Sequence, residues 1–194
     1  MHSQRDEEKV ILQWAGARIG TFLDIGAYNP TVFSNVRALY EKGWSGVLVE
    51  PSPECFVGLM NAYKEDPRIT LVNAMIGTGS CALRKFYSSP DAVGTSVEGN
   101  YKVWKDHASF RPIYMPCIPV SEIFTIAQKF DFISIDAEGV SFEILRAIDL
   151  KAVGCDLVCV ETDCNEAALH THFTRNNFEV IHKTAENIIA ARIK

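Results

Sequence analysis

Three acidic residues follow two apolar stretches and could perform acid–base chemistry. Asp136 ends the stretch DFISID, Glu138 lies in the turn AEG directly after it, and Glu161 lies at the end of the apolar stretch DLVCVET. Parallel strands present their carboxyl ends at one edge of a sheet, so we expect these side chains to meet there. Crowded carboxylates can act as a general base, accept a substrate hydroxyl or bind a divalent metal.

A second pair of acids ends the first two predicted strands. In TFLDIGAYNP, Asp24 ends the strand and Gly26 follows in the turn, which places a carboxylate beside an exposed backbone N–H group. Glu50 ends the strand in GVLVEPS, where an acid takes both hydroxyls of a ribose in several nucleotide-binding folds. The alternative for Asp24 is a strand-end acid that caps the next helix.

The turn after the first strand limits which nucleotide can bind. It reads DIGAYNP and lacks the later glycines of GxGxxG, which let the backbone approach the diphosphate of a dinucleotide. S-adenosylmethionine (SAM) has no phosphate, and its ammonium group can donate hydrogen bonds to Asp24. The turn therefore favours SAM, with S-adenosylhomocysteine as product. Asn73, Ala74 and Met75 end the third strand, where an adenine edge would lie.

The elements that position these residues alternate between strands and helices. The pattern predicts an α/β fold of the Rossmann type, with a mostly parallel seven-stranded sheet, helices on both faces and a C-terminal antiparallel hairpin. We expect one domain over residues 1–194, with an N-terminal helix within residues 1–20. The predicted strands are 22–25, 46–50, 69–76, 131–136 and 156–162, and the predicted helices are 5–18, 31–42, 53–64, 121–128, 140–148 and 165–174.

Residues 88–118 break this alternation. The segment is rich in turn-forming residues, so we expect a long loop. Long loops in compact domains are usually lids or binding segments, and we expect this one to lie on the side where the molecule that accepts the methyl group of SAM would bind. Tyr101 and Lys102 are predicted to contact the acceptor, and His107 is a further candidate base. No motif in this loop identifies the acceptor.

Composition excludes several classes of function. The net charge of −5 and the pI near 5.5 provide no basic field for a duplex nucleic acid. The polar N-terminus and the lack of a long apolar stretch predict a cytoplasmic protein without a membrane span. Six cysteines without a CxxC pair indicate neither a zinc site nor a disulfide framework. A divalent metal fits the acids, but we predict none.

The sequence resembles the FkbM-type methyltransferases, a SAM-dependent family that acts mostly on hydroxyls of sugars and related natural products. Matching blocks run in the family's order through residues 23–162, and IDAEG is the most specific part. Ser134 stands where the family commonly has lysine, and Pro30 where glycine is frequent. The blocks are LDIGAYNPTVFSNVRALYEKGWSGVLVEPSPECF, ITLVNAMIG, GTSV, PVSEIF, FDFISIDAEGVSFEILRAI and DLVCVET.

The resemblance implies a class I methyltransferase that methylates a hydroxyl of a sugar or another small or glycan acceptor. Asp136, Glu138 and His107 are the candidate catalytic residues, and Glu161 joins Tyr101 and Lys102 as a candidate acceptor contact. The candidate SAM contacts are Asp24, Gly26, Ala27, Tyr28, Asn29, Ser34, Glu50, Pro51, Ser52, Asn73, Ala74, Met75 and Asp136.

Two alternatives stay open. The first is a catalytically silent module that keeps the SAM fold and binds a partner or small ligand, and the second is an NAD-dependent enzyme. An RNA ribose methyltransferase is disfavoured by the acidic charge and by the absence of a lysine pair at the strand ends.

Overall fold

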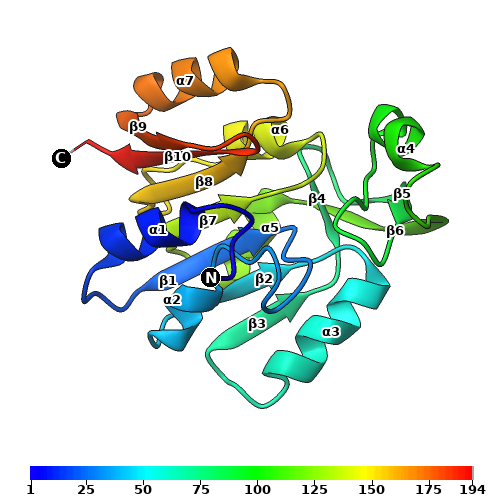
Figure 1. Ribbon diagram of the computed structural model, residues 1–194, viewed down its shortest axis with the longest axis horizontal. Helices are drawn as coiled ribbons and strands as arrows, with labels where there is room; N and C mark the ends of the chain where they lie inside the picture. The colour runs from blue at the N-terminus through cyan, green and yellow to red at the C-terminus, as the bar shows by residue number, and fades with distance from the viewer. Residues whose placement is uncertain (194) are drawn as a thin grey trace.

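A computed structural model describes residues 1–193, which form a large and a small sheet with helices around them (Figure 1). The large sheet has seven strands in the order β3-β2-β1-β7-β8-β10-β9. In this sheet β3, β2, β1, β7 and β8 are parallel, and β10 is antiparallel to both of its neighbours. The bounds are β1 Thr21–Ile25, β2 Ser45–Val49, β3 Ile69–Val72, β7 Phe132–Ile135, β8 Leu157–Glu161, β9 Phe178–Lys183 and β10 Asn187–Arg192.

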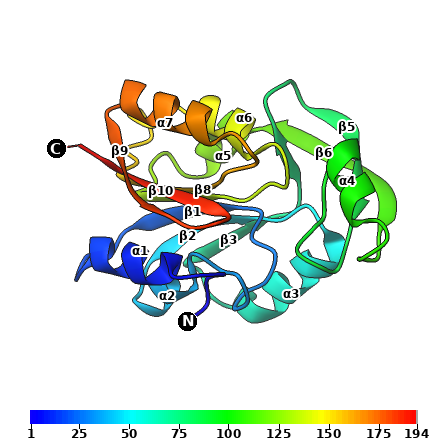
Figure 2. The same cartoon turned by 45° about the horizontal axis from the view of Figure 1, so that its top comes forward.

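Helices cover both faces of this sheet (Figure 2). Helices α1 (Glu7–Ala15), α2 (Arg37–Glu41) and α3 (Pro53–Tyr63) lie on one face, and α5 (Val120–Ile126), α6 (Ser141–Arg146) and α7 (Glu166–Arg175) lie on the other. Successive side chains of a strand point to opposite faces of the sheet. Phe22 of β1 therefore packs in the core under α1, α2 and α3, and Leu23 packs in the core under α5, α6 and α7. The predicted fold class is confirmed, including the hairpin strand β10 inserted between β8 and β9.

The small sheet corrects two sequence-based expectations. The strand predicted at 69–76 is two strands, because the chain leaves the large sheet after β3 and enters the small one as β4 (Met75–Gly77). The predicted loop 88–118 contains α4 (Glu98–Trp104) and most of β6 (Arg111–Pro119), which pairs along its length with β5 (Ala82–Ser88). Three prolines in β6 are turn signals in the sequence, but cross-strand pairing overrides them.

The helix predicted at 31–42 is also shorter than expected, because α2 begins only at Arg37. The Asn29 side chain accepts backbone N–H bonds from Thr31 and Val32, both at 3.0 Å. This local turn competes with helical hydrogen bonding at residues 29–33. The predicted helix start is therefore wrong, and the freed segment becomes a loop above the end of β1.

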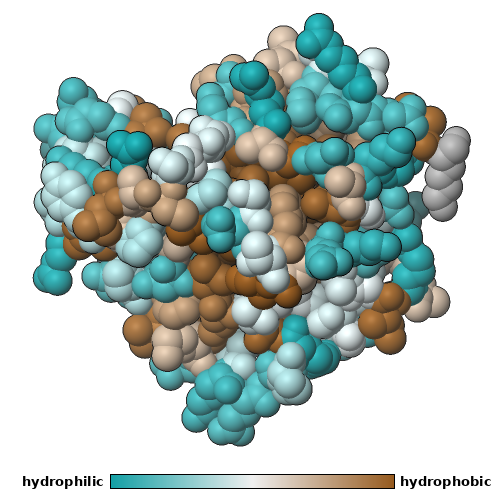
Figure 3. Space-filling view, turned by 180° about the vertical axis from the view of Figure 1, so that it is seen from behind, coloured by the Kyte–Doolittle hydropathy of each residue, from teal (hydrophilic) through white to brown (hydrophobic). Residues whose placement is uncertain are grey.

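The surface mixes hydrophilic and hydrophobic residues. Seen from behind, hydrophobic residues gather toward the centre of the face (Figure 3). No helix among residues 1–193 has the length and apolar character that a membrane span requires.

Candidate active site

A cavity of about 610 Å³ lies where β1, β2, β7 and β8 end. This is the edge at which parallel α/β sheets bind ligands, and the volume falls within the usual range for small-molecule sites. Its lining includes ten of the residues singled out in the sequence, which are Gly26, Tyr28, Glu50, Pro51, Ser52, Ala74, Met75, Asp136, Glu138 and Glu161.

Strained backbone is concentrated at this cavity. Within residues 1–193, six non-glycine residues have positive φ, and five of these six line the cavity. A non-glycine residue in such a conformation costs on the order of 1–3 kcal/mol and persists only where the surrounding structure holds it. This clustering supports a functional site. The five residues are Tyr28, Phe33, Glu138, Asp163 and Cys164.

Glu50 is held rigidly at the end of β2. Its side chain is buried, and its two carboxylate oxygens accept backbone N–H bonds from Tyr28 at 2.8 Å and Ser52 at 2.6 Å. A carboxylate has about four acceptor positions, so two remain for a ligand. Burial raises the pKa of Glu50 to about 7, against the opposing effect of the two backbone N–H groups. Asn73 supports this turn by donating to the Glu50 carbonyl at 2.8 Å.

Gly26 brings β1 and β7 together below the cavity. A Cβ atom at this position would lie 1.7 Å from the carbonyl oxygen of Asp136, and the φ angle of Gly26 is +84°. Only glycine fits both the close approach and the left-handed conformation. The glycine therefore serves the junction of the two strands and leaves its backbone on the cavity surface.

Asp24 lies within β1 and not at its end as predicted, because Ile25 is the last residue of the strand. It lies beneath the cavity and is not part of its lining. Burial raises the pKa of Asp24 to about 7, and a hydrogen bond from Ser134 acts in the opposite direction. The Asn35 amide in turn donates to the Ser134 hydroxyl at 3.3 Å and to the Cys159 thiol at 3.6 Å. Asp24 is thus placed in a small buried polar network under the site.

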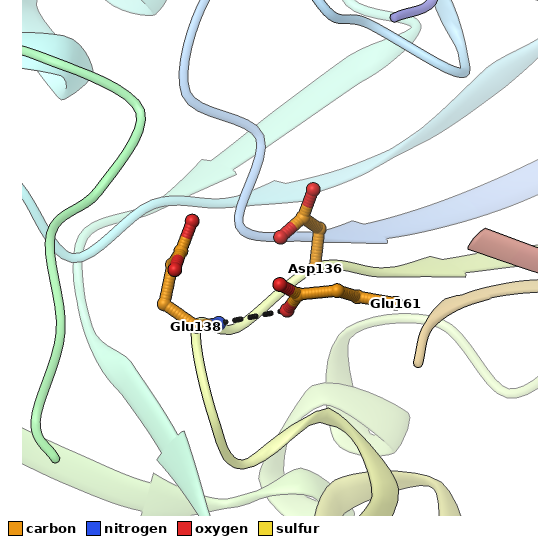
Figure 4. Close-up of side chains that lie close together, drawn as sticks. All are labelled: Asp136, Glu138 and Glu161. Carbon is orange, nitrogen blue, oxygen red and sulfur yellow. Dashed lines mark hydrogen bonds between the residues drawn. The ribbon is translucent and has the colours of Figure 1, made fainter. Parts of the chain in front are cut away.

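The acids around Asp136 meet as expected from the strand ends. One carboxylate oxygen from each of Asp136, Glu138 and Glu161 lies within 4.8 Å of the others (Figure 4). The Glu138 N–H donates to Glu161 at 3.2 Å, and the Ser141 hydroxyl donates to the same oxygen at 3.1 Å. Glu161 is fixed by these bonds, and its carboxyl group lies beside that of Asp136.

Crowding and burial shift the proton affinities of this cluster upward. Burial, and then the charges of Asp136 and Asp163, raise the pKa of Glu138 to about 8. Burial and the neighbouring acids raise the pKa of Glu161 well above its ordinary range. A protonated Glu161 can donate its hydrogen to Asp136 and stabilise the Asp136 carboxylate. The alternative use of three such oxygens is to bind Mg²⁺ or Ca²⁺, which prefer carboxylate ligands.

Asp163 fixes the turn that carries Glu138. Its two carboxylate oxygens accept N–H bonds from Gly139 at 2.8 Å and from Ser141 at 2.9 Å, at the start of α6. Thr95 holds the same turn from the other side by donating to the Glu138 carbonyl at 2.8 Å. Asp163 also lines the cavity, but the sequence analysis missed it, although it follows Glu161 by only two positions.

Several residues chosen from the sequence have supporting positions outside the lining. Ala27 is buried in the core, and Ser34 is buried and accepts an N–H bond from Arg37 at 3.1 Å at the start of α2. Asn29 and Asn73 make the turn contacts given above and also lie outside the lining.

The α4 region places a different set of residues at the cavity from the set expected. Tyr101 stacks on Tyr87 with ring centroids 3.9 Å apart, Lys102 pairs with Glu98 at 3.8 Å, and His107 is exposed. None of Tyr101, Lys102 and His107 is in the lining. The α4 residues that do line it are Asn100, Val103 and Trp104. Their spacing of three and four positions is a helical signal that the sequence analysis missed.

Comparison with known proteins identifies the family. Residues 24–183 match the family described as the methyltransferase FkbM domain. The chain belongs to the FkbM methyltransferase family. It is therefore a methyltransferase, and enzymes of this family and fold generally use SAM. No curated protein matches the sequence.

Solved structures support the fold of this FkbM methyltransferase. A methyltransferase FkbM from Methylobacillus flagellatus KT matches with a TM-score of 0.56 at 15% identity over 89% of this chain and 43% of that chain. A precorrin-6y C5,15-methyltransferase from Geobacter metallireducens GS-15 matches with a TM-score of 0.55 at 14% identity, over 96% and 87%. A ribosomal protein L11 methylase from Lactobacillus delbrueckii subsp. bulgaricus matches with a TM-score of 0.51 at 10% identity, over 97% and 78%.

The charge of the cavity fits the cofactor of an FkbM methyltransferase. Within the part of the chain that the structure describes, the lining includes seven acidic residues and no lysine, arginine or histidine. Such a lining suits the ammonium and sulfonium groups of SAM and opposes a diphosphate. The acids are Glu50, Asp91, Asp136, Glu138, Glu161, Asp163 and Glu186.

Proposed function

We propose that this FkbM methyltransferase binds SAM in the cavity and methylates a hydroxyl of a sugar or another small hydroxyl-bearing acceptor. The observation that carries the proposal is that one cavity joins Glu50 to the three carboxyl groups around Asp136. The first position suits a ribose, and the second suits a proton acceptor.

The residues at the end of β2 would hold the cofactor. Glu50 has two acceptor positions left, and its rigid backbone contacts keep it aimed at the two ribose hydroxyls. Ala74 and Met75 are buried beside the cavity and provide an apolar surface for an adenine. Bound SAM supplies a methyl group that its sulfonium already activates.

The Asp136 carboxylate would take the proton of the acceptor hydroxyl. The new bond forms between the acceptor oxygen and the methyl carbon, while the bond from that carbon to sulfur breaks and the proton passes to Asp136. Glu161 acts as a positioning residue, because it is itself held by Glu138 and Ser141 and has a carboxylate oxygen within 4.8 Å of one of Asp136. His107 has no part in this proposal, because it lies outside the lining.

Cofactor binding is tested by titrating the protein with S-adenosylhomocysteine in a calorimeter. Glu50→Gln should weaken binding at least tenfold, because tenfold corresponds to about 1.4 kcal/mol and a hydrogen bond to a charged group contributes about 1.5–3 kcal/mol. Glu65→Gln is the matched control, since it makes the same change at a side chain that is 87% exposed and lies outside the cavity lining. Binding of NADH in place of S-adenosylhomocysteine would contradict the proposal.

Catalysis is tested by methyl transfer from radiolabelled SAM to a panel of sugars. Asp136→Asn should lower kcat by about 100-fold or more, the usual range for loss of a general base, while S-adenosylhomocysteine binds within a few-fold of the wild type. Full turnover by Asp136→Asn would refute the assignment of the base. Binding without transfer to any hydroxyl-bearing acceptor would instead favour a catalytically silent module.

A further inference from the structure

Helix α4 presents two apolar side chains to the cavity, and neither of them packs in a hydrophobic core. Asn100, Val103 and Trp104 lie three and four positions apart, so they share one side of the helix, and all three line the cavity. The helix has no buried residue, and Val103 and Trp104 are 66% and 41% exposed. Burial in the protein interior therefore does not explain these two apolar side chains.

A small number of contacts place the helix against the turn that follows Asp136. Tyr101 stacks on Tyr87, whose hydroxyl donates to Glu98. A Cβ atom on Gly139 would lie 2.8 Å from the Asn100 amide nitrogen, so α4 packs directly on the turn after Asp136. These contacts place the exposed face of α4 next to the acids.

A second aromatic ring reaches the same cavity from the loop after β1. Phe33 is 49% exposed and lines the cavity, and its ring stacks on Tyr28 at a centroid distance of 6.4 Å and an interplanar angle of 23°. Both residues have positive φ, at 59° and 45°. Non-glycine residues hold such a conformation only where the surrounding structure supports it, and here the segment that holds it carries a large ring to the cavity.

The charge of the lining adds a second selection. An acceptor with a phosphate or carboxylate group would enter a cavity with seven acids and no basic side chain among the described lining residues. The anion would lose water without gaining a lysine, arginine or histidine partner from the described lining, which disfavours its binding. An uncharged ring with hydroxyl groups meets no such penalty.

We propose that Trp104 and Phe33 select the acceptor as an uncharged pyranose ring, and that the acidic lining rejects sugars that carry phosphate or carboxylate. The inference rests on the proposed methyl transfer, and it assigns the two aromatic residues as specificity determinants of that site. The apolar C–H face of the ring packs on the aromatic side chains, and its hydroxyls face Asn100 and the acids.

The test pairs neutral methyl pyranosides with the corresponding methyl uronates, which differ by one carboxylate. Binding is measured by saturation-transfer NMR with S-adenosylhomocysteine present, and methyl transfer by the label from SAM. The neutral member of at least one pair should bind and be methylated with a kcat/KM at least tenfold above that of its uronate. Equal or better use of the uronates would overturn the proposal, as would failure of every neutral pyranoside to bind.

Variants separate the aromatic wall from the cofactor site. Trp104→Ala should lower kcat/KM for the neutral pyranoside at least tenfold, Trp104→Phe should restore most of it, and the Kd of S-adenosylhomocysteine should stay within about twofold of the wild type. Trp14→Phe is the control. Trp14 lies in α1, packs on Trp44 and Phe132, and is not part of the cavity lining. Unchanged kcat/KM in Trp104→Ala would refute the inference.

Failure of the proposed function gives a different result. If S-adenosylhomocysteine does not bind the wild-type protein, methyl transfer is refuted by the calorimetric titration. Saturation-transfer NMR on the protein alone then still decides whether Trp104 binds neutral rings in preference to uronates.

Discussion

Gly26 shows how a single residue fixes the geometry of the site. Its missing side chain lets the turn after β1 pass against the carbonyl of Asp136, and its positive φ turns the chain toward the cavity. The two halves of the proposed site, one at β1 and β2 and the other at β7 and β8, therefore meet at this position. A change at Gly26 should affect stability and cofactor binding together.

Gly26→Ala should destabilise the protein by about 2–5 kcal/mol. The left-handed conformation costs an alanine about 1–2 kcal/mol, and the contact with the Asp136 carbonyl adds a cost of overpacking of about 1–3 kcal/mol. The free energy of unfolding is measured by urea denaturation monitored by circular dichroism.

Gly58→Ala in α3 is the matched control. Gly58 lies inside a helix, has no atoms within 4 Å of an added Cβ and has no positive φ, so the change should stabilise the protein by about 0.5–1 kcal/mol. An equal effect of the two substitutions would show that the close approach at Gly26 is unimportant.

At the scale of elements, the small sheet with α4 forms a wall that the large sheet alone could not provide. Strand β5 pairs with β6, and Tyr87 at the end of β5 stacks on Tyr101 of α4. Because α4 has no buried residue, its position depends on this stack and on the contacts of Thr95 with Glu138 and of Asn100 with Gly139. The acceptor side is thus held by few contacts.

Tyr101→Ala should release α4 without unfolding the rest of the protein. An aromatic pair contributes about 0.5–1.5 kcal/mol beyond its buried area, which is small against the global stability but large for a helix without a core. Amide hydrogen exchange at residues 98–104 should become faster, while the urea midpoint changes little.

Lys102→Ala provides the control for this prediction, since its 3.8 Å ion pair with Glu98 is exposed and contributes little. Unchanged exchange at residues 98–104 in Tyr101→Ala would mean that other contacts hold the helix.

For the molecule as a whole, the distribution of charge matters more than its total. Burial raises the pKa of Asp24, of Glu50 and of Glu138, all around the carboxyl ends of the central strands. The folded protein therefore holds protons near neutral pH that the unfolded chain releases near pH 4. A cationic ligand that enters this region favours the ionised carboxylates and displaces those protons.

Stability should fall as the pH rises from 5 to 8. The pKa values of Asp24 and Glu50 are about 7 in the folded protein and about 4 in the unfolded chain, so their contribution is present below pH 4 and is lost as the pH passes through 7. The free energy of unfolding should decrease by roughly 2–5 kcal/mol over this range. Urea denaturation at several pH values measures the slope.

Asp24→Asn should flatten the pH dependence, because the neutral amide cannot release a proton. Asp91→Asn should leave it unchanged, since Asp91 is exposed. A stability that is constant or rises between pH 5 and 8 in the wild type would contradict the raised pKa values of the buried acids.

The sequence alone determined the succession of most strands of the large sheet along the chain and the positions of four acids at their ends. Short apolar stretches such as FLDI and DFISID predict buried strands. An acid at the end of such a strand lies at the edge of the sheet where the parallel strands end. Glu50, Asp136, Glu138 and Glu161 could therefore be found from spacing alone.

Only the tertiary structure decided the acceptor side and the role of individual turn residues. The chain from Met75 to Pro119 carries proline and turn signals, and it becomes a second sheet because β6 pairs with strands far from it in sequence. Which face of α4 meets the cavity depends on the stack of Tyr101 on Tyr87. Asp24 is buried because it lies within β1, in register with Ser134 of the neighbouring strand β7. Local sequence patterns do not predict such long-range contacts. These contacts place Trp104 at the cavity and His107 outside it.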